Sequence, residues 1–454
     1  MIKPLLLSNC ELVNEGNRSE CILIIEQPFI KEVIINPSSD DLVNLKNTGE
    51  YNVIDLEGRT VIPGIIDDQV HLREPGLTNK ADIYHESKAA IAGGVTSFMD
   101  MPNTIPNAVT QGILEEKYEI ARNKSLANYS FYIGATNDNL NDLSNIDYSK
   151  VCGIKVFMGA STGNMLVDNR TSLNNIFKLK DVLIAVHCED EQTIKKNTEY
   201  YKSLYGNKIP IKFHSDIRSE ESCYKSSSFA VSLAKEHNTK LHVLHLTTAK
   251  ELSLFDNQLD LKDKKITAEV CVHHLWFDEK DYIPLQGLIK CNPSIKKETD
   301  KRALLEGLNN NSIDIIATDH APHTFQEKQS DYLNCPSGLP SIQFSLLLML
   351  EYYKQNKISI EKIVEKMCHN PSILFKIDRR GFIRKGYYAD LAVIDLNKGF
   401  TVSKDILLSK CAWSPYEGQN FSSKIEQTYI NGILAYNNGH FNDNINSMRL
   451  QFSH

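Results

Sequence analysis

Short apolar runs and longer amphipathic stretches alternate through the middle of the chain. The runs, about five residues long, include VTSFMDM, GIKVFMG, LIAVHCED, LHVLHLT and IDIIATDH. The stretches between them, such as YHESKAAIAGG and CYKSSSFAVSLAKEH, have the length and periodicity of helices. This alternation is typical of βα units around a parallel sheet. About eight such units in roughly 310 residues predict an α/β fold, a TIM-like (β/α)8 barrel.

The two ends of the chain have a different pattern, with short β-like runs and glycine turns. Examples are CILIIEQPFIKEVIIN near the start, and GFIRKGYYADLAVIDL and IEQTYINGILAYNNG near the finish. In the last of these, Asn431-Gly432 predicts the turn of a hairpin. We therefore expect residues 1–60 and 379–454 to form the two parts of one small β-sandwich. The barrel would occupy residues 61–378.

The stretch PGIIDDQVHLR, residues 63–73, predicts a buried strand that ends in a polar site. Side chains alternate along a strand, so Gln69, His71 and Arg73 would face one way and Val70 and Leu72 would pack the other way. His71 is a candidate metal ligand and Arg73 a candidate anion-binding residue. Gln69 stands where a second histidine would be expected.

Polar residues also follow the other predicted strands, and the carboxyl ends of barrel strands meet at one face. In chain order they are Asn103, Lys155, His187, His245, Asn292, Asp319 and His323. Each has a simpler explanation by itself: a lone histidine is usually a hydrogen-bonded structural residue, Lys155 could extend out of a core, and Asp319 could cap a helix. Their joint occurrence at strand ends favours one site, and nitrogen and carboxylate ligands suit zinc.

The remaining histidines and cysteines give no comparable signal. We expect His214, His242, His273, His274 and His320 to be structural or on the surface. Strand alternation would turn Cys188 and Cys291 away from the site. The ten cysteines form no CxxC pair, so buried free thiols are the default expectation.

Composition excludes several classes of function. The chain is 41% hydrophobic and 24% charged, as in ordinary soluble proteins, and its net charge of −7 argues against non-specific nucleic-acid binding. No apolar run approaches the length that spans a membrane. The apolar run within the first residues, MIKPLLLSNCELVNEG, is too short for the core of a signal peptide. We therefore expect a cytoplasmic protein without membrane or nucleic-acid partners.

Motifs along nearly the whole chain resemble those of dihydroorotases in the amidohydrolase superfamily, a class close to hydantoinases and allantoinases. They are VIPGIIDDQVHLREPG, AGGVTSFMDMPNT, GIKVFMGASTGNM, VHCED, LHLTTAKE, ATDHAPH, HNPSILFKI and RGFIRKGYYADLAVID. HLREPG together with MPNT favours dihydroorotase over hydantoinase, which typically lacks that arginine. Allantoinases usually differ at Thr104.

The resemblance implies a centre of two zinc ions. His71 and Asp319 would bind the first and His187 and His245 the second, and a carboxylated Lys155 would bridge them. The modification makes chemical sense, because an ammonium group would repel two cations whereas a carbamate is an anion with two oxygens. Asp319 would also act as general base and acid in the reversible cyclisation of N-carbamoyl-L-aspartate to L-dihydroorotate, a step of pyrimidine synthesis.

The resemblance also implies a set of substrate contacts. Arg73, Asn103 and His323 would bind the unreactive carboxylate, Asn292 the ring, and Ser337 and Gly338 would reach the substrate through backbone groups. The polar segment TFQEKQSDYLNC before them could be a mobile cover. Relatives are often dimers, so we expect a homodimer.

Two positions depart from the family pattern. Gln69 could bind zinc through its oxygen, could position a water, or could leave the first metal weakly held. Asp68 beside it is a possible substitute ligand, but a neighbour in a strand should face the other way. Gln343 replaces a common glutamate and has no assigned role. The alternative functions are an allantoinase or hydantoinase-type cyclic amidohydrolase, or a non-catalytic dihydroorotase-like scaffold that binds a catalytic partner.

Overall fold

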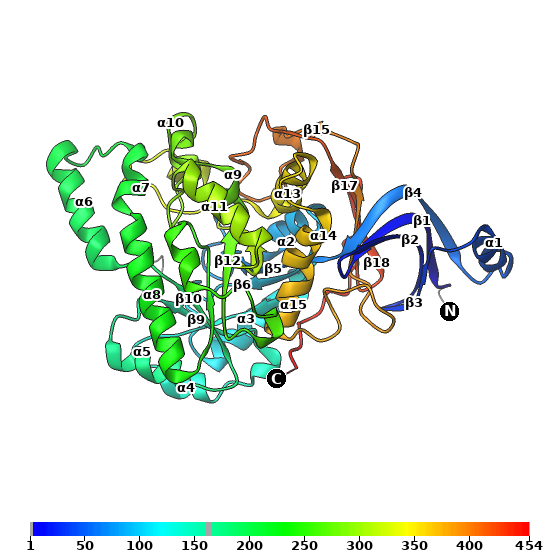
Figure 1. The fold of residues 1–454 in the computed structure, drawn as a ribbon, viewed down its shortest axis with the longest axis horizontal. Helices are drawn as coiled ribbons and strands as arrows, with labels where there is room; N and C mark the ends of the chain where they lie inside the picture. Colours follow the sequence, from blue (N-terminus) through cyan, green and yellow to red (C-terminus); the bar gives the residue numbers. More distant parts are fainter. Residues whose placement is uncertain (1–2, 160–164, 454) are drawn as a thin grey trace.

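Parallel strands form the barrel that was predicted for the middle of the chain (Figure 1). The computed structural model describes residues 3–159 and 165–453. The barrel strands are β5 (Ile65–Val70), β6 (Val95–Asp100), β7 (Asn128–Phe131) with its continuation β8 (Ile133–Gly134), β9 (Ile154–Phe157), β10 (Leu183–His187), β11 (Lys240–Val243), β12 (Ile266–Cys271) and β13 (Ile315–Ala317). With β7 and β8 counted as one, these labels give eight strands among the described residues.

The ring closes between its last and first strands. β5, β6 and β7 are hydrogen-bonded in that order, as are β8 to β13. Val70 forms a parallel bridge with His320, and the backbone N–H of His71 donates to the carbonyl oxygen of His320 at 2.7 Å. The ends of β5 and β13 therefore lie side by side, which brings their polar residues together.

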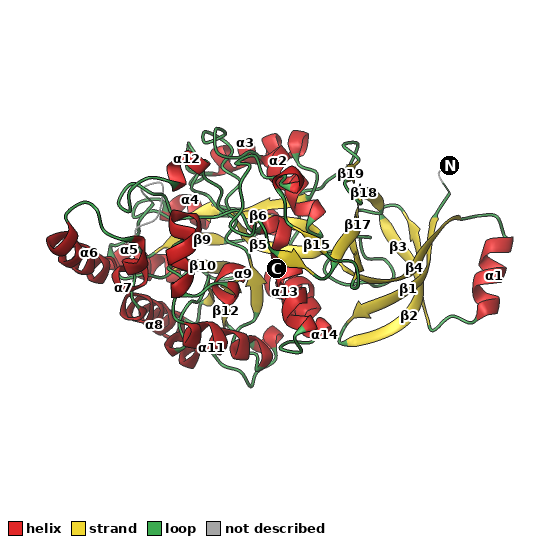
Figure 2. Ribbon diagram, turned by 90° about the horizontal axis from the view of Figure 1, so that it is seen from above, coloured by secondary structure: helices red, strands yellow, loops and turns green. Residues whose placement is uncertain are grey.

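Helices surround the barrel strands (Figure 2). They are α2 (Ile83–Ala92), α3 (Gln111–Lys124), α4 (Leu140–Ser144), α5 (Arg170–Phe177), α6 (Glu191–Tyr205), α7 (His214–Ile217), α8 (Glu220–His237), α9 (Val272–Trp276), α10 (Tyr282–Leu285), α11 (Glu298–Asn309), α12 (Phe325–Lys328), α13 (Ser345–Lys354), α14 (Ile360–Val364) and α15 (Asn370–Phe375). The helix predicted from CYKSSSFAVSLAKEH is α8, which starts where the Ser219 side chain accepts from the N–H of Ser222 and ends at Asn238 in the left-handed conformation.

Both chain ends contribute to one β-rich region, as predicted. Its eight-stranded sheet has the order β19-β18-β17-β14-β4-β1-β2-β3. The strands are β1 (Leu5–Asn14), β2 (Asn17–Glu26), β3 (Phe29–Ile35), β4 (Asn52–Pro63), β14 (Leu391–Asp395), β17 (Lys424–Ile430), β18 (Ile433–Asn437) and β19 (His440–Phe441). The helix α1 (Ser39–Asn47) and the strand pair β15 (Phe400–Thr401) and β16 (Asn420–Phe421) complete the elements outside the barrel.

The predicted turn between β17 and β18 is confirmed. Ile430 pairs with Ile433, which leaves two residues in the turn. Asn431 and Gly432 have φ angles of 50° and 76°, the left-handed conformation that this tight hairpin requires.

The last described residues return to the barrel. The N–H of Tyr129 donates to the carbonyl of Met448 at 3.0 Å, and the N–H of Leu450 donates back to Tyr129 at 2.9 Å. Leu450 and Phe452 are buried in one hydrophobic cluster with Ile66 and other barrel residues. In Figure 1 the C-terminus accordingly lies at the barrel and far from the N-terminus.

None of the helices in the described part of the chain is long and apolar enough to span a bilayer.

Candidate active site

The candidate site begins at an irregularity in β5. Pairing between β5 and β6 shifts register between Asp67 and Val70, so the two-residue alternation is broken there. Gln69 and Asp68 are both buried. Asp68 lies below the site, where its carboxylate is 3.3 Å from the Nε2 of His242, a residue of β11 across the barrel. The expectation that Asp68 would turn out of the barrel was therefore wrong, although it does not line the site cavity.

A small open cavity at the carboxyl ends of the strands collects most of the predicted residues. It is lined by Gln69, His71, Arg73, Lys155, Phe157, His187, His245, Asn292, Asp319, Ala321 and Ser337. Asn103 and His323 lie directly behind this lining, and Gly338 follows Ser337. The structure thus brings together the residues that the sequence placed at separate strand ends. The predicted place of Asn292 was wrong in one respect, because it follows the short 3-10 helix Gln286–Ile289 and not a strand.

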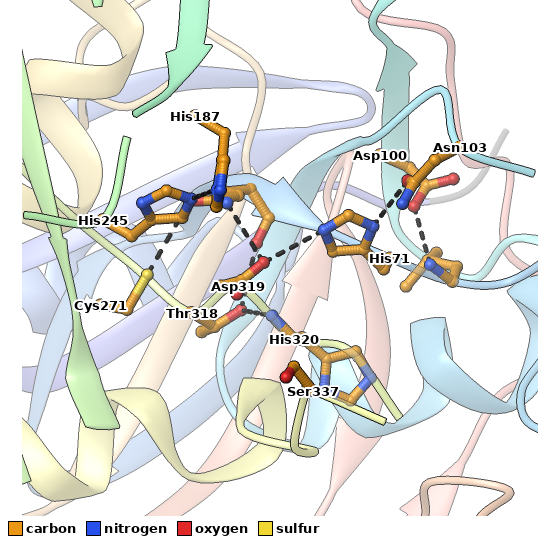
Figure 3. A network of polar contacts seen from close by, with 12 residues as sticks. His71, Asp100, Asn103, His187, His245, Cys271, Thr318, Asp319, His320 and Ser337 are labelled. Carbon is orange, nitrogen blue, oxygen red and sulfur yellow. Dashed lines mark hydrogen bonds and ion pairs between the residues drawn. The ribbon is translucent and has the colours of Figure 1, made fainter. Parts of the chain in front are cut away.

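His71 and Gln69 both approach one carboxylate oxygen of Asp319. The Nε2 of His71 and the Nε2 of Gln69 each lie 3.1 Å from Oδ1 of Asp319. Nδ1 of His71 lies 2.8 Å from Oδ1 of Asn103, which accepts its hydrogen (Figure 3). Burial lowers the pKa of His71, so the ring is neutral at pH 7. With the proton on Nδ1, the lone pair of Nε2 faces an anionic oxygen.

His187 and His245 form the second convergent pair. Nδ1 of His187 lies 3.0 Å from Nε2 of His245 (Figure 3), and Nε2 of His187 lies 3.3 Å from the carboxylate of Glu189. Burial lowers the pKa of both histidines. Among the described residues Nδ1 of His245 has no hydrogen-bond partner although it is buried. With a proton on that atom, and with the His187 proton on Nε2 toward Glu189, the two facing nitrogens have lone pairs directed at one point.

Lys155 lies between these two pairs, on β9. Its side chain is buried, and its amine nitrogen lies 4.7 Å from the ring centroid of Phe157. Burial lowers the pKa of Lys155 to about 8, although Asp319 and Glu269 oppose the shift. A neutral amine, the form that reacts with CO2, is therefore accessible close to neutral pH.

The residues present fit a metal centre. Lone pairs of His71, His187 and His245 point at carboxylate oxygen or at one another, which is unfavourable unless a cation lies between them. Imidazole nitrogen and carboxylate oxygen are the ligands that zinc uses in catalytic sites. The arrangement of these side chains is therefore compatible with the zinc ligands predicted from the sequence, and Gln69 lies beside them.

The other wall of the cavity is cationic. Arg73 is buried, its Nε donates to the carbonyl of Pro322 at 3.1 Å, and one terminal nitrogen lies 3.0 Å from Nε2 of His323. Nε2 of His323 is also 3.0 Å from the carbonyl oxygen of Ser337. The Ser337 hydroxyl donates to Oδ1 of Asn292 at 2.9 Å. A guanidinium in such a pocket is suited to a carboxylate.

Three site residues adopt left-handed backbone conformations that non-glycine residues rarely use. The φ angles are 67° for Arg73, 41° for His245 and 44° for Asp319. Such strain costs about 1–3 kcal/mol per residue, and functional sites are one place where it is found. The N–H of His245 is fixed by the carboxylate of Glu269 at 3.0 Å, so the fold supports this strained conformation directly.

Several supporting residues were not predicted. Phe157 and Ala321 line the cavity, and Asp67 ties β5 to β13 by accepting from the Thr318 hydroxyl at 2.6 Å. Glu189 contacts His187, and Asp100 accepts from the N–H of Leu72 at 2.7 Å. Asp100 and Glu189 follow apolar runs in the sequence and could have been noticed by that signal, whereas the apolar Phe157 and Ala321 carry none.

The remaining expectations have clear outcomes. His214, His242, His273, His274 and His320 are all buried and none is on the surface, and Cys188 and Cys291 lie in the hydrophobic core. The amide of Gln343 donates to the carbonyl of Ile406 at 2.7 Å and accepts from the N–H of Leu408 at 3.0 Å, so it attaches that segment to the barrel. Residues 160–164 of the GIKVFMGASTGNM motif lie outside the described residues.

Comparison with known proteins agrees with this geometry. Residues 60–434 match the family described as "Amidohydrolase family". The chain belongs to the amidohydrolase family. A dihydroorotase of Methanosphaera stadtmanae is 30% identical over 96% of this chain and 97% of its own length, and one of Carboxydothermus hydrogenoformans is 31% identical over 94% and 96%.

The L-hydantoinase of Arthrobacter aurescens has the same fold, with a TM-score of 0.92 at 23% identity over 99% of this chain and 100% of that one. At that identity the likeness concerns the fold alone. The barrel and β-rich region that the sequence predicted are therefore those of this amidohydrolase family, and the resemblance to dihydroorotases is confirmed by the curated relatives.

Proposed function

We propose that the protein is a zinc-dependent dihydroorotase, which interconverts N-carbamoyl-L-aspartate and L-dihydroorotate in pyrimidine synthesis. The proposal rests on one cavity that has candidate metal ligands on one side and a cationic group on the other. On one wall lie the converging nitrogens and oxygen of His71, His187, His245 and Asp319, and on the other lies the buried guanidinium of Arg73. A cyclic amide that also bears a carboxylate needs both. The curated relatives named dihydroorotase support the same conclusion.

In this proposal His71 and Asp319 would hold one zinc ion, His187 and His245 a second, and Lys155, if carboxylated, would be a ligand shared by both. Gln69 is the doubtful member of the first set. Zinc bound there supplies Lewis-acid chemistry, since it lowers the pKa of water and polarises a carbonyl group.

The chain's own residues handle the proton and the substrate. Burial raises the pKa of Asp319, but its contact with His71 and the nearby amine of Lys155 outweigh burial, so its pKa lies below the usual range and it is ionised at pH 7. Asp319 therefore accepts the proton of the attacking water at a carboxylate oxygen. It then delivers that proton to the departing ring nitrogen, and the two transfers reverse in the biosynthetic direction.

Arg73, Asn103 and His323 are assigned to the substrate carboxylate, Asn292 to the ring, and Ser337 and Gly338 to backbone contacts. The deciding experiment supplies purified protein with zinc and offers L-dihydroorotate, hydantoin and allantoin in turn. Turnover of dihydroorotate in clear preference supports the proposal. Preference for hydantoin or allantoin would assign the alternative enzyme class, and no turnover with zinc bound would favour a scaffold.

Arg73→Ala separates substrate recognition from metal binding. The loss of a buried, charge-assisted contact should raise KM for dihydroorotate by about tenfold or more, while zinc content stays close to wild type. Steady-state kinetics and metal analysis on the same preparation check this. Near-wild-type activity of Arg73→Ala would show that the assigned substrate is wrong.

Three further assignments belong to the same proposal. The functional division of the chain is residues 1–60 and 379–454 for the β-rich domain and 61–378 for the catalytic barrel, with residues 448–452 of the C-terminal part returning to the barrel. The protein works as a homodimer in the cytosol on a small-molecule substrate.

A further inference from the structure

The ring of His323 has donors or acceptors on both nitrogens. Nε2 faces a terminal nitrogen of Arg73 and the carbonyl oxygen of Ser337, each at 3.0 Å. Nδ1 lies 3.1 Å from the amine nitrogen of Lys80. His323 is 1% exposed, so no bulk water can substitute for these partners. The position of its single hydrogen is therefore fixed by protein groups.

Lys80 is held against His323 by an ion pair. Its Nζ lies 2.8 Å from a carboxylate oxygen of Glu327, and its side chain is 16% exposed. Glu327 is positioned in turn by the first turn of α12, where its carboxylate accepts from the N–H and the hydroxyl of Thr324, both at 2.9 Å. Glu327, Lys80 and His323 thus form a continuous line that ends at the anion-binding wall.

This line determines the tautomer of His323. A lysine ammonium group has three donors and no acceptor, so the nitrogen that faces Lys80 must accept. Burial and the neighbouring Arg73 hold the pKa of His323 far below its usual range, which makes the ring neutral with one N–H. That hydrogen is consequently on Nε2, where the carbonyl of Ser337 can accept it.

The same assignment affects Arg73. A protonated Nε2 offers no lone pair, so the nearby Arg73 nitrogen cannot donate to it. The Nε2 hydrogen of His323 is directed to the carbonyl oxygen of Ser337, so the hydrogen of the nearby Arg73 nitrogen finds no acceptor on the ring. A guanidinium hydrogen left available in this way is complementary to a carboxylate oxygen.

We propose that Lys80 is a positioning residue for substrate recognition: through its contact with Nδ1 it keeps His323 in the Nε2–H tautomer, which donates to Ser337, cannot accept from Arg73, and so leaves the Arg73 donor available to the substrate carboxylate. The inference rests on the proposed dihydroorotase activity for the identity of that carboxylate. Its structural part, the tautomer, is independent of any activity. Lys80 acts through His323 and touches no reacting atom.

The experiment compares Lys80→Met, which keeps the length of the side chain but not its donors, with Lys80→Arg, which keeps both charge and donors. Lys80→Met should raise KM for dihydroorotate by about tenfold, with kcat and zinc content within about twofold of wild type. Lys80→Arg should restore most of the affinity. Lys88→Met is the matched control, because Lys88 lies on α2 against the rings of Tyr84 and Phe441, outside the site.

The tautomer is read separately from the ¹⁵N chemical shifts of histidine-labelled protein, with His323→Gln to assign the signal. Wild type should show hydrogen on Nε2, and Lys80→Met should show a shift toward the other tautomer. Hydrogen on Nδ1 in wild type, or an unchanged KM in Lys80→Met, would overturn the inference. If wild type turns over no dihydroorotate, the proposed function fails, whereas the ¹⁵N shifts still decide the tautomer.

Discussion

The two pairs of residues proposed to bind metal differ in what faces their nitrogen atoms. At His187 and His245, two ring nitrogens face each other at 3.0 Å, with no carboxylate oxygen shared between them. At His71, the facing atom is the carboxylate oxygen of Asp319, and the amide of Gln69 reaches the same oxygen at 3.1 Å. With lone pairs on both facing nitrogens the first arrangement is stabilised by a cation, whereas the second is partly satisfied by the hydrogen of an amide.

This difference indicates how a glutamine at position 69, in place of a histidine, can weaken a metal site without removing it. As placed, Gln69 neutralises part of the charge of Asp319 through a donor, and its oxygen faces Cys271, whose sulfur lies 3.8 Å away. A histidine at the same position would offer a lone pair in place of a donor. We therefore expect the His187–His245 pair to hold zinc more firmly than the His71–Asp319 pair.

The largest effect should come from His187→Ala. It removes one of the two facing nitrogens, so the firmly held zinc is lost and turnover falls by about a thousandfold or more. Zinc content and kcat of the purified variant check this, with the half-buried His85→Gln on α2 as a control that changes a histidine outside the site. Retention of zinc and activity in His187→Ala would reverse the ranking of the two pairs.

A smaller effect is expected from Gln69→His, which makes the two pairs more alike. The added imidazole ligand should raise affinity for the weaker zinc ion by about tenfold to a hundredfold. Zinc per chain, measured during stepwise chelation, should fall in two separate steps for wild type and in closer steps for the variant. Two equally firm zinc ions in wild type would contradict the difference inferred here.

The smallest expected effect concerns pH and the bridge between the pairs. Carbamate forms from the neutral amine, so a pKa of about 8 for Lys155 places about a tenth of the amine in the reactive form at pH 7 and about nine tenths at pH 9. At a fixed concentration of dissolved ¹³CO2, metal-free protein should give a carbamate ¹³C signal that increases from pH 7 to pH 9 in proportion to the neutral fraction of the amine. Lys155→Met serves as the blank. A signal that does not change with pH would show that burial does not control carboxylation.

Much of the site was predictable because several barrel strands are apolar runs that contain or are followed by a polar residue. His71, Lys155, His187, His245 and Asp319 could be placed on this basis. Their convergence then followed from the fold class, since parallel strands of a barrel end on one face. The resemblance to dihydroorotases supplied roles but not geometry.

Other features depended on contacts that no local pattern encodes. The register shift in β5 turned Asp68 into the barrel toward His242, against the expected alternation. The short strands β7 and β8 lack a clean apolar run and were not identified. The line from Glu327 through Lys80 to His323 joins residues 243 positions apart along the chain, so it could be seen only after folding.

The return of residues 448–452 to the barrel has a consequence for biosynthesis. Met448, Leu450 and Phe452 pair with or pack beneath strands that the ribosome releases more than 300 residues earlier, and Leu450 is fully buried. Domains generally fold as they emerge, starting from the N-terminal side. Here the barrel base stays open until these last residues have been synthesised, so the nascent chain exposes an apolar surface that a chaperone can recognise.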